Sequence, residues 1–119
     1  MKTALVVEDS KTEQEFMNRT LTQMGWQVAL VSDVDDARGK MASEKPDIIC
    51  LDVILPGQSG FEFCRELKLN PETKNIPVII CSTKGTEVDR TWGTMLGADA
   101  YLAKPIDPEE LKQTVNRLV

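Results

Sequence analysis

Residues 48–60 read IICLDVILPGQSG, a continuous apolar run that ends at the carboxylate of Asp52 and is followed by a turn containing proline and glycine. A short apolar run without polar alternation is typical of a strand covered on both faces, as in a parallel sheet. Three other runs have the same character and a fifth is weaker. The sequence therefore predicts five strands, at residues 4–7, 28–31, 48–51, 78–81 and 100–103.

The segments between these strands carry apolar residues at helical spacing, three or four positions apart. Each set predicts one helix with an apolar face toward the sheet. The sets are Met17, Leu21 and Met24; Val34, Ala37 and Met41; Phe61, Cys64 and Leu67; Val88, Trp92 and Met95; and Leu111, Val115 and Leu118.

Residues that begin or end helices and strands fall at the boundaries between these segments. Serine and aspartate favour helix N-caps, glycine favours the position after a helix, and proline favours the first helical residue. We expect Ser10 and Asp107-Pro108 to open helices, Gly25 and Gly97 to end them, and Pro46 and Pro77 to precede strands. Strands that alternate with helices predict one doubly wound α/β domain over residues 1–119, with a parallel sheet and helices on both faces.

Composition excludes several classes of function. The 119 residues carry a net charge of −5 with no basic cluster, which argues against direct nucleic-acid binding. Apolar runs reach only about five residues, whereas a membrane span needs roughly twenty. The N-terminus meets acidic residues before any signal-peptide core could form, so we expect no membrane insertion and a cytoplasmic location.

The cysteines and the absence of histidine exclude further chemistry. The chain has no histidine and no CxxC spacing, so zinc sites and Cys–His or Ser–His catalysis are unsupported. Cys50 and Cys81 lie within apolar runs, and we expect buried, reduced thiols there. A redox pair between them is the alternative, although nothing nearby in the sequence would lower a thiol pKa.

Polar residues terminate four of the five predicted strands. Ligands of open parallel sheets bind at the carboxyl ends of the strands, so these residues should converge on one edge. They are Glu8 and Asp9 after the first strand, Asp52 after the third, Ser82 and Thr83 at the fourth, and Lys104 and Pro105 after the fifth.

This set of groups fits a phosphoryl group bridged to Mg²⁺. Three converging carboxylates repel one another unless a cation neutralises them, and hard oxygen ligands suit Mg²⁺. Lys104 and the Ser82 hydroxyl can contact further anionic oxygens. Asp52, on the central strand, is the natural nucleophile.

The motifs VVEDS (6–10), LDVILPGQSG (51–60), VIICST (78–83) and YLAKP (101–105), each at a strand end, resemble those of the receiver domains of two-component response regulators. The resemblance covers essentially the whole chain. It implies a flavodoxin-like (βα)5 fold with strand order 2-1-3-4-5, and a chemotaxis-type signalling switch. Residues 82–93, STKGTEVDRTWG, also resemble stand-alone receivers of the chemosensory systems for twitching motility and phototaxis.

The resemblance also implies a role for each site residue. Asp52 would accept the phosphoryl group from a sensor histidine kinase. Asp9 would bind Mg²⁺ directly and Glu8 through water, with Asp52 and the backbone carbonyl of Ile54 as further ligands. Lys104 would contact the phosphoryl group, next to a cis peptide at Pro105. Ser82 and Tyr101 would form the switch pair. Pro56 and Gly60 would shape the loop after the nucleophile.

The resemblance further implies that phosphorylation changes the face formed by helix four, strand five and helix five, where a downstream protein binds. Three alternatives remain open. The chain could be a constitutive interaction module, the receiver portion of a longer regulator, or a phosphatase of the haloacid dehalogenase type. The phosphatase would need a DxDxT pattern, and Ile54 stands where its second acid belongs.

Overall fold

The computed structural model describes residues 2–83, 91 and 96–119. In chain order the elements are β1 (Thr3–Val7), α1 (Lys11–Gln23), β2 (Gln27–Val31), α2 (Val34–Ser43), β3 (Ile48–Asp52), α3 (Gly60–Leu69), β4 (Val78–Ser82), β5 (Ala100–Ala103) and α5 (Pro108–Leu118). The helix predicted around Val88, Trp92 and Met95 lies outside the described residues, as does most of the segment with the chemosensory resemblance. The other nine predicted elements are confirmed.

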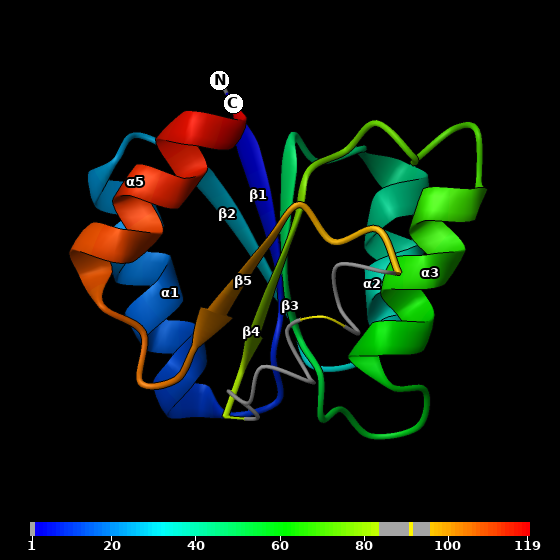
Figure 1. The fold of residues 1–119 in the computed structure, drawn as a ribbon, viewed down its shortest axis with the longest axis horizontal. Helices are drawn as coiled ribbons and strands as arrows, with labels where there is room; N and C mark the ends of the chain where they lie inside the picture. The colour runs from blue at the N-terminus through cyan, green and yellow to red at the C-terminus, as the bar shows by residue number, and fades with distance from the viewer. Residues whose placement is uncertain (1, 84–90, 92–95) are drawn as a thin grey trace.

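All five strands are parallel and form one sheet in the order β2-β1-β3-β4-β5. This confirms the doubly wound, flavodoxin-like arrangement. In Figure 1, α1 and α5 cover one face of the sheet and α2 and α3 cover the other. The central strand β3 and its neighbour β4 are buried at every position, as their continuous apolar runs predict.

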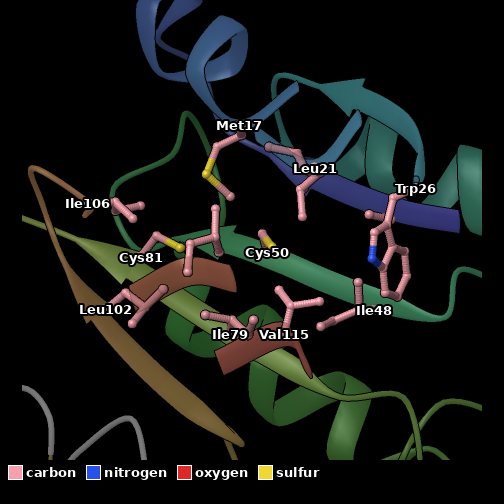
Figure 2. Packing of buried hydrophobic residues seen from close by; sticks show 13 residues of the cluster. Met17, Leu21, Trp26, Ile48, Cys50, Ile79, Cys81, Leu102, Ile106 and Val115 are labelled. Carbon is pink, nitrogen blue, oxygen red and sulfur yellow. The ribbon is translucent and has the colours of Figure 1, made fainter. Parts of the chain in front are cut away.

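Alternate residues of each strand enter two separate cores, because successive side chains of a strand point to opposite faces. Along β3, Ile48 and Cys50 pack beneath α1 and α5, whereas Ile49 and Leu51 pack beneath α2 and α3. Figure 2 shows the first core, in which Trp26 from the α1–β2 turn packs beside Ile48. The helical periodicity gave no indication of this tryptophan.

One detail of the expected packing was wrong. Residues of β2 are partly buried or exposed, and Leu30 is 38% exposed. The reason is that β2 is an edge strand with a single neighbour. In α3, the expected Phe61, Cys64 and Leu67 all pack against the core, with Phe61 only partly buried. The buried aromatic side chain of that helix is Phe63, which the expected set does not contain.

Each described helix begins with a polar N-cap whose side chain accepts a backbone N–H. Such a cap is worth about 1 kcal/mol. Two of the caps, Ser10 and Asp107, are those expected, and Gly25 has the expected positive φ of 93°. Asp33 and Ser59 cap α2 and α3. Among the described helices, none is both long and apolar enough to cross a membrane.

Candidate functional site

The predicted site residues converge at the carboxyl edge of the sheet. Asp52 ends β3 and Ser82 ends β4, while Glu8 and Lys104 directly follow β1 and β5. The parallel register places Asp52 beside Cys81 and Ser82 beside Ala103. Residues far apart in the chain are therefore neighbours because their strands end at the same level.

Three carboxylates form a compact cluster. Glu8, Asp9 and Asp52 each offer one oxygen atom, and these atoms lie within 4.8 Å of one another. Glu8 and Asp52 are buried and Asp9 is exposed, so the cluster has one open side. The backbone N–H of Ser10 donates to Glu8 Oε2 at 3.1 Å and helps to hold that carboxylate in place.

Lys104 supplies the nearest positive charge. Its Nζ donates to Glu8 Oε1 and lies 3.5 Å from Asp52 Oδ2, with the side chain only 9% exposed. The backbone N–H of Lys104 donates to the carbonyl of Ser82 at 2.9 Å, and the Lys104–Pro105 peptide is cis. Burial lowers the pKa of Lys104, but the Glu8 hydrogen bond and the nearby carboxylates outweigh it, so the pKa is raised and the amine stays charged.

The environment of Asp52 disfavours its charge. Burial, the largest cause, raises the pKa of Asp52 to about 6, and the Glu8 carboxylate adds to the rise. The Lys104 charge and the backbone N–H groups of Val53 and Ile54 lower the pKa and so oppose this rise. Burial penalises an ion because it removes hydration. Among the described residues, the Lys104 charge does not offset the burial of Asp52 and the nearby Glu8 carboxylate, so a further cation would stabilise the charged form of Asp52.

The loop after Asp52 returns to this residue at the start of α3. The N–H of Gly60 donates to the carbonyl of Val53 at 2.9 Å. A Cβ atom on Gly60 would lie 1.9 Å from the carbonyl oxygen of Asp52 and 2.9 Å from Val53 Cα. Only glycine allows this approach, so the prediction that Gly60 shapes the loop has a steric basis here.

The two residues expected to form the switch lie on one face of the sheet. Ser82 is fully buried, and Tyr101 is half-buried against the core beneath α2 and α3. Tyr101 pairs with Ile80 in the register, two positions before the pair of Ser82 and Ala103. Because Ile80 and Ser82 are two residues apart, their side chains and that of Tyr101 leave the sheet on the same side.

The remaining predicted site residue, Ile54, has a 56% exposed side chain, so its apolar group does not fill the site. Its expected contribution is the backbone carbonyl. Gln14 belongs to the site although no sequence pattern points to it: its Nε2 donates to the backbone carbonyl of Glu8 and so links α1 to the acidic cluster. A contact between a helical side chain and a strand-end carbonyl leaves no periodic signal in the sequence.

Beneath the carboxylates, a small cavity is lined by apolar and sulfur-bearing side chains. Met17, Cys50, Cys81 and Ile106 line it, and Figure 2 shows these side chains gathered between α1 and the sheet. Both cysteines are buried and free, and burial raises the pKa of Cys50 to about 12. The buried thiols expected from the sequence, without a bond between them, are confirmed.

Comparisons with known proteins agree with this geometry. The sequence pattern of the family described as the response regulator receiver domain matches residues 4–116. The protein PilH of Pseudomonas aeruginosa PAO1 is 40% identical over 119 residues, covering 100% of this chain and 98% of that protein. The phosphate regulon transcriptional regulatory protein PhoB of Escherichia coli K12 is 41% identical over 107 residues; the match covers 90% of this chain and 47% of PhoB, about half its length.

Two solved structures are similar over nearly the whole chain. The chemotaxis protein CheY4 of Vibrio cholerae has a TM-score of 0.91 at 29% identity, covering 100% of this chain and 99% of that one. The receiver domain of the sensor histidine kinase PA1611 from Pseudomonas aeruginosa PAO1 has a TM-score of 0.88 at 28% identity, covering 98% and 96%. That structure has a magnesium ion coordinated in its active site cleft.

Proposed function

The chain belongs to the response regulator receiver domain family of two-component signalling. We propose that it is a switch that a sensor histidine kinase phosphorylates on Asp52. The observation that carries the proposal is the convergence of Asp52 with Glu8, Asp9 and Lys104 at one edge of the sheet. A nucleophile, two further acids and one cation are what transfer of a phosphoryl group to a carboxylate requires.

The donor set fits Mg²⁺. Glu8, Asp9 and Asp52 present three hard oxygen ligands within 4.8 Å, and one side of the cluster is exposed. Among the described residues, Lys104 alone forms ion pairs with the cluster, which leaves net negative charge there. Mg²⁺ prefers a few carboxylates and keeps several of its waters. We propose Asp9, Asp52 and the Ile54 carbonyl as direct ligands, with Glu8 acting through water. When bound, the ion supplies positive charge that neutralises phosphoryl oxygens.

Asp52, Lys104 and Ser82 each have a separate role in the transfer of the phosphoryl group. An Asp52 oxygen attacks the phosphorus of a phosphohistidine, the P–N bond breaks, and the imidazole nitrogen keeps the electron pair. Lys104, held by Glu8, lies close enough to Asp52 to stabilise the anionic oxygens during transfer. Buried Ser82 is on the neighbouring strand end, where its hydroxyl can donate to the bound phosphoryl group.

The site is built to hold a phosphoryl group and not to turn over a substrate. A phosphatase of the haloacid dehalogenase type needs a second acid two residues after the nucleophile, and this position is the exposed Ile54. The family is one of signalling switches. We therefore propose that the chain assists only its own phosphorylation and dephosphorylation.

We propose that the output is a change of packing around Tyr101. A phosphoryl group adds roughly two negative charges and three acceptor oxygens, which draw Ser82 toward it. Tyr101 leaves the same face of the sheet two register positions away, so it can enter space that Ser82 vacates. The affected face is that of helix four, β5 and α5, which we propose as the docking face for a downstream protein. Helix four lies outside the described residues.

The nature of the relatives indicates the process. PilH matches over 98% of its length, and CheY4, a chemotaxis protein, over 99%. We propose a cytoplasmic regulator of chemosensory motility. The receiver portion of a longer regulator is the second candidate, and the half-length match to PhoB favours it. The constitutive interaction module is disfavoured because the site residues are all present and converge.

Binding of a phosphate mimic tests the proposal. Beryllofluoride should give a protein-bound ¹⁹F resonance in Mg²⁺ buffer, and the resonance should vanish in EDTA or in the Asp52→Asn variant. A bound signal that survives in Asp52→Asn would place the anion elsewhere. No bound signal in the wild type under any condition would favour the interaction module.

A further inference from the structure

A second cation with several hydrogen bonds, Lys68, is partly buried at the opposite edge of the sheet from Asp52. Its side chain is 15% exposed. The Nζ atom donates to the carbonyls of Lys74 at 3.2 Å and Ile76 at 2.8 Å, and to Asp99 Oδ2 at 2.7 Å. An ammonium has three donors, so all are used. Lys68 thus joins the last turn of α3 to the α3–β4 connection and to the residue before β5.

Asp99 is fixed from two further directions. Its Oδ2 accepts the backbone N–H of Val78 at 2.8 Å, and its own N–H donates to the carbonyl of Val78 at 2.9 Å. Val78 is the first residue of β4. The carboxylate therefore holds the starts of β4 and β5 together and ties both to Lys68.

The chain before Asp99 is fitted closely against the lysine stem. Gly97 has a φ of +96°, and a Cβ on it would lie 2.8 Å from Lys68 Cγ. One turn earlier in α3, Cys64 Sγ lies 3.9 Å from the carbonyl of Leu96. Leu96 and Gly97 thus lie in close contact with the C-terminal half of α3.

α3 is in consequence held at both ends by contacts that tolerate little change. At its first residue, Gly60 lies against the carbonyl of Asp52; at its last turn, Lys68 binds Asp99. Asp99 is two residues before Tyr101. One short helix therefore links the loop of the nucleophile to the strand that carries the aromatic residue.

Stability alone explains the ion pair poorly, because Asp99 is exposed and Lys68 only partly buried, and an ion pair open to water adds little free energy of folding. What distinguishes the pair is that its hydrogen bonds join three segments of the chain and so fix one arrangement of them. Here that arrangement is the position of β5 relative to α3.

We propose that Lys68 and Asp99 are a positioning pair that transmits the state of Asp52 to Tyr101, a role that rests on the phosphorylation proposed above. The close contact at Gly60 couples the position of α3 to the backbone of Asp52. The Lys68–Asp99 pair couples the position of the start of β5 to that of α3. This route is separate from the direct one through Ser82. Coupling of this kind requires a contiguous set of contacts that both ends can bias.

Tyr101 is the only tyrosine of the chain, so 3-fluorotyrosine gives a single ¹⁹F reporter. In the wild type, acetyl phosphate with Mg²⁺ should displace its resonance. In Lys68→Met and in Asp99→Asn the displacement should fall below half of the wild-type value. Lys68→Arg should restore most of it, and the double variant should lose no more than either single variant.

Matched control variants distinguish a loss of coupling to Tyr101 from a loss of folding and from a loss of phosphoryl uptake at Asp52. Asp99→Asn keeps an acceptor for the Val78 N–H, which protects the fold. Lys45→Met removes an exposed lysine that donates to the Glu72 carbonyl on the same connection, at 3.0 Å, and should respond like the wild type. Phosphoryl uptake by intact mass should be equal in all variants, since none touches Asp52.

The possible failures are distinguishable. If the ¹⁹F resonance of Tyr101 is displaced as far in both Lys68→Met and Asp99→Asn as in the wild type, the role of the positioning pair is overturned. Loss of phosphoryl uptake in those variants alone also overturns it, because the pair would then act on the Asp52 site itself. A wild type with neither uptake nor displacement overturns the proposed function instead.

Discussion

Gly60 lies so close to Asp52 that a Cβ atom on it would stand 1.9 Å from the Asp52 carbonyl oxygen. No side chain can occupy that position without moving the backbone of the proposed nucleophile. The first residue of α3 is thus part of the construction of the site, although it carries no chemical group.

The first prediction follows from this contact. Gly60→Ala should destabilise the protein by about 2 to 3 kcal/mol, because the clash is with backbone that cannot rotate away. It should also slow phosphoryl uptake. Gly39→Ala is the control: Gly39 lies within α2 with open space around its Cβ position, so alanine should stabilise by about 0.5 to 1 kcal/mol. Urea unfolding of both variants measures this, and equal stabilities would contradict the steric account.

A second prediction concerns pH. The folded-state pKa of Asp52 is raised to about 6 from 3.8, so ionisation of Asp52 opposes folding. The cost is absent below about pH 4, grows as pH rises toward 6 and is complete above it. One pKa unit corresponds to about 1.4 kcal/mol, so in EDTA at pH 8 the Asp52→Asn variant should be more stable than the wild type by about 1 to 3 kcal/mol.

This gain should vanish near pH 4, where the wild-type carboxyl is protonated too. Asp47→Asn serves as the comparison, because Asp47 lies at the far edge of the sheet, its Asn variant keeps an acceptor for the Thr3 N–H at 2.8 Å, and it should gain no stability at pH 8. Denaturant unfolding at both pH values tests the difference. An Asp52→Asn variant less stable than the wild type at pH 8 would mean that Lys104 fully compensates the charge.

The third prediction concerns the metal. A ligand that binds only the folded state raises the midpoint of thermal unfolding. Mg²⁺ at millimolar concentration should therefore raise the unfolding temperature of the wild type. Asp9→Asn should abolish the rise with little change in metal-free stability, since Asp9 is exposed. If Asp9→Asn keeps the full Mg²⁺ response in a thermal scan, the ion binds without that carboxylate.

Most of the architecture could be predicted from local patterns. Apolar runs located all five strands, and the edge at which they end located Asp52, Glu8 and Lys104 together, because parallel strands bring their carboxyl ends to one level. Ser10 and Asp107 capped the helices that they were expected to cap.

What was missed depends on contacts between distant segments. Trp26 enters the core from a turn, and the exposure of β2 follows from its place in the sheet order. Lys68 and Asp99 each resemble ordinary surface charges in the sequence. Their pairing follows from the meeting of α3 with the start of β5, which no helical or strand period encodes.

The central claim is that Asp52 is the residue that accepts the phosphoryl group. Intact-mass spectrometry after incubation with acetyl phosphate tests it most directly, with and without Mg²⁺, on the wild type, Asp52→Asn and the control Asp47→Asn. The account predicts a Mg²⁺-dependent gain of one phosphoryl group in the wild type and in Asp47→Asn, and none in Asp52→Asn. An equal gain in Asp52→Asn would contradict it.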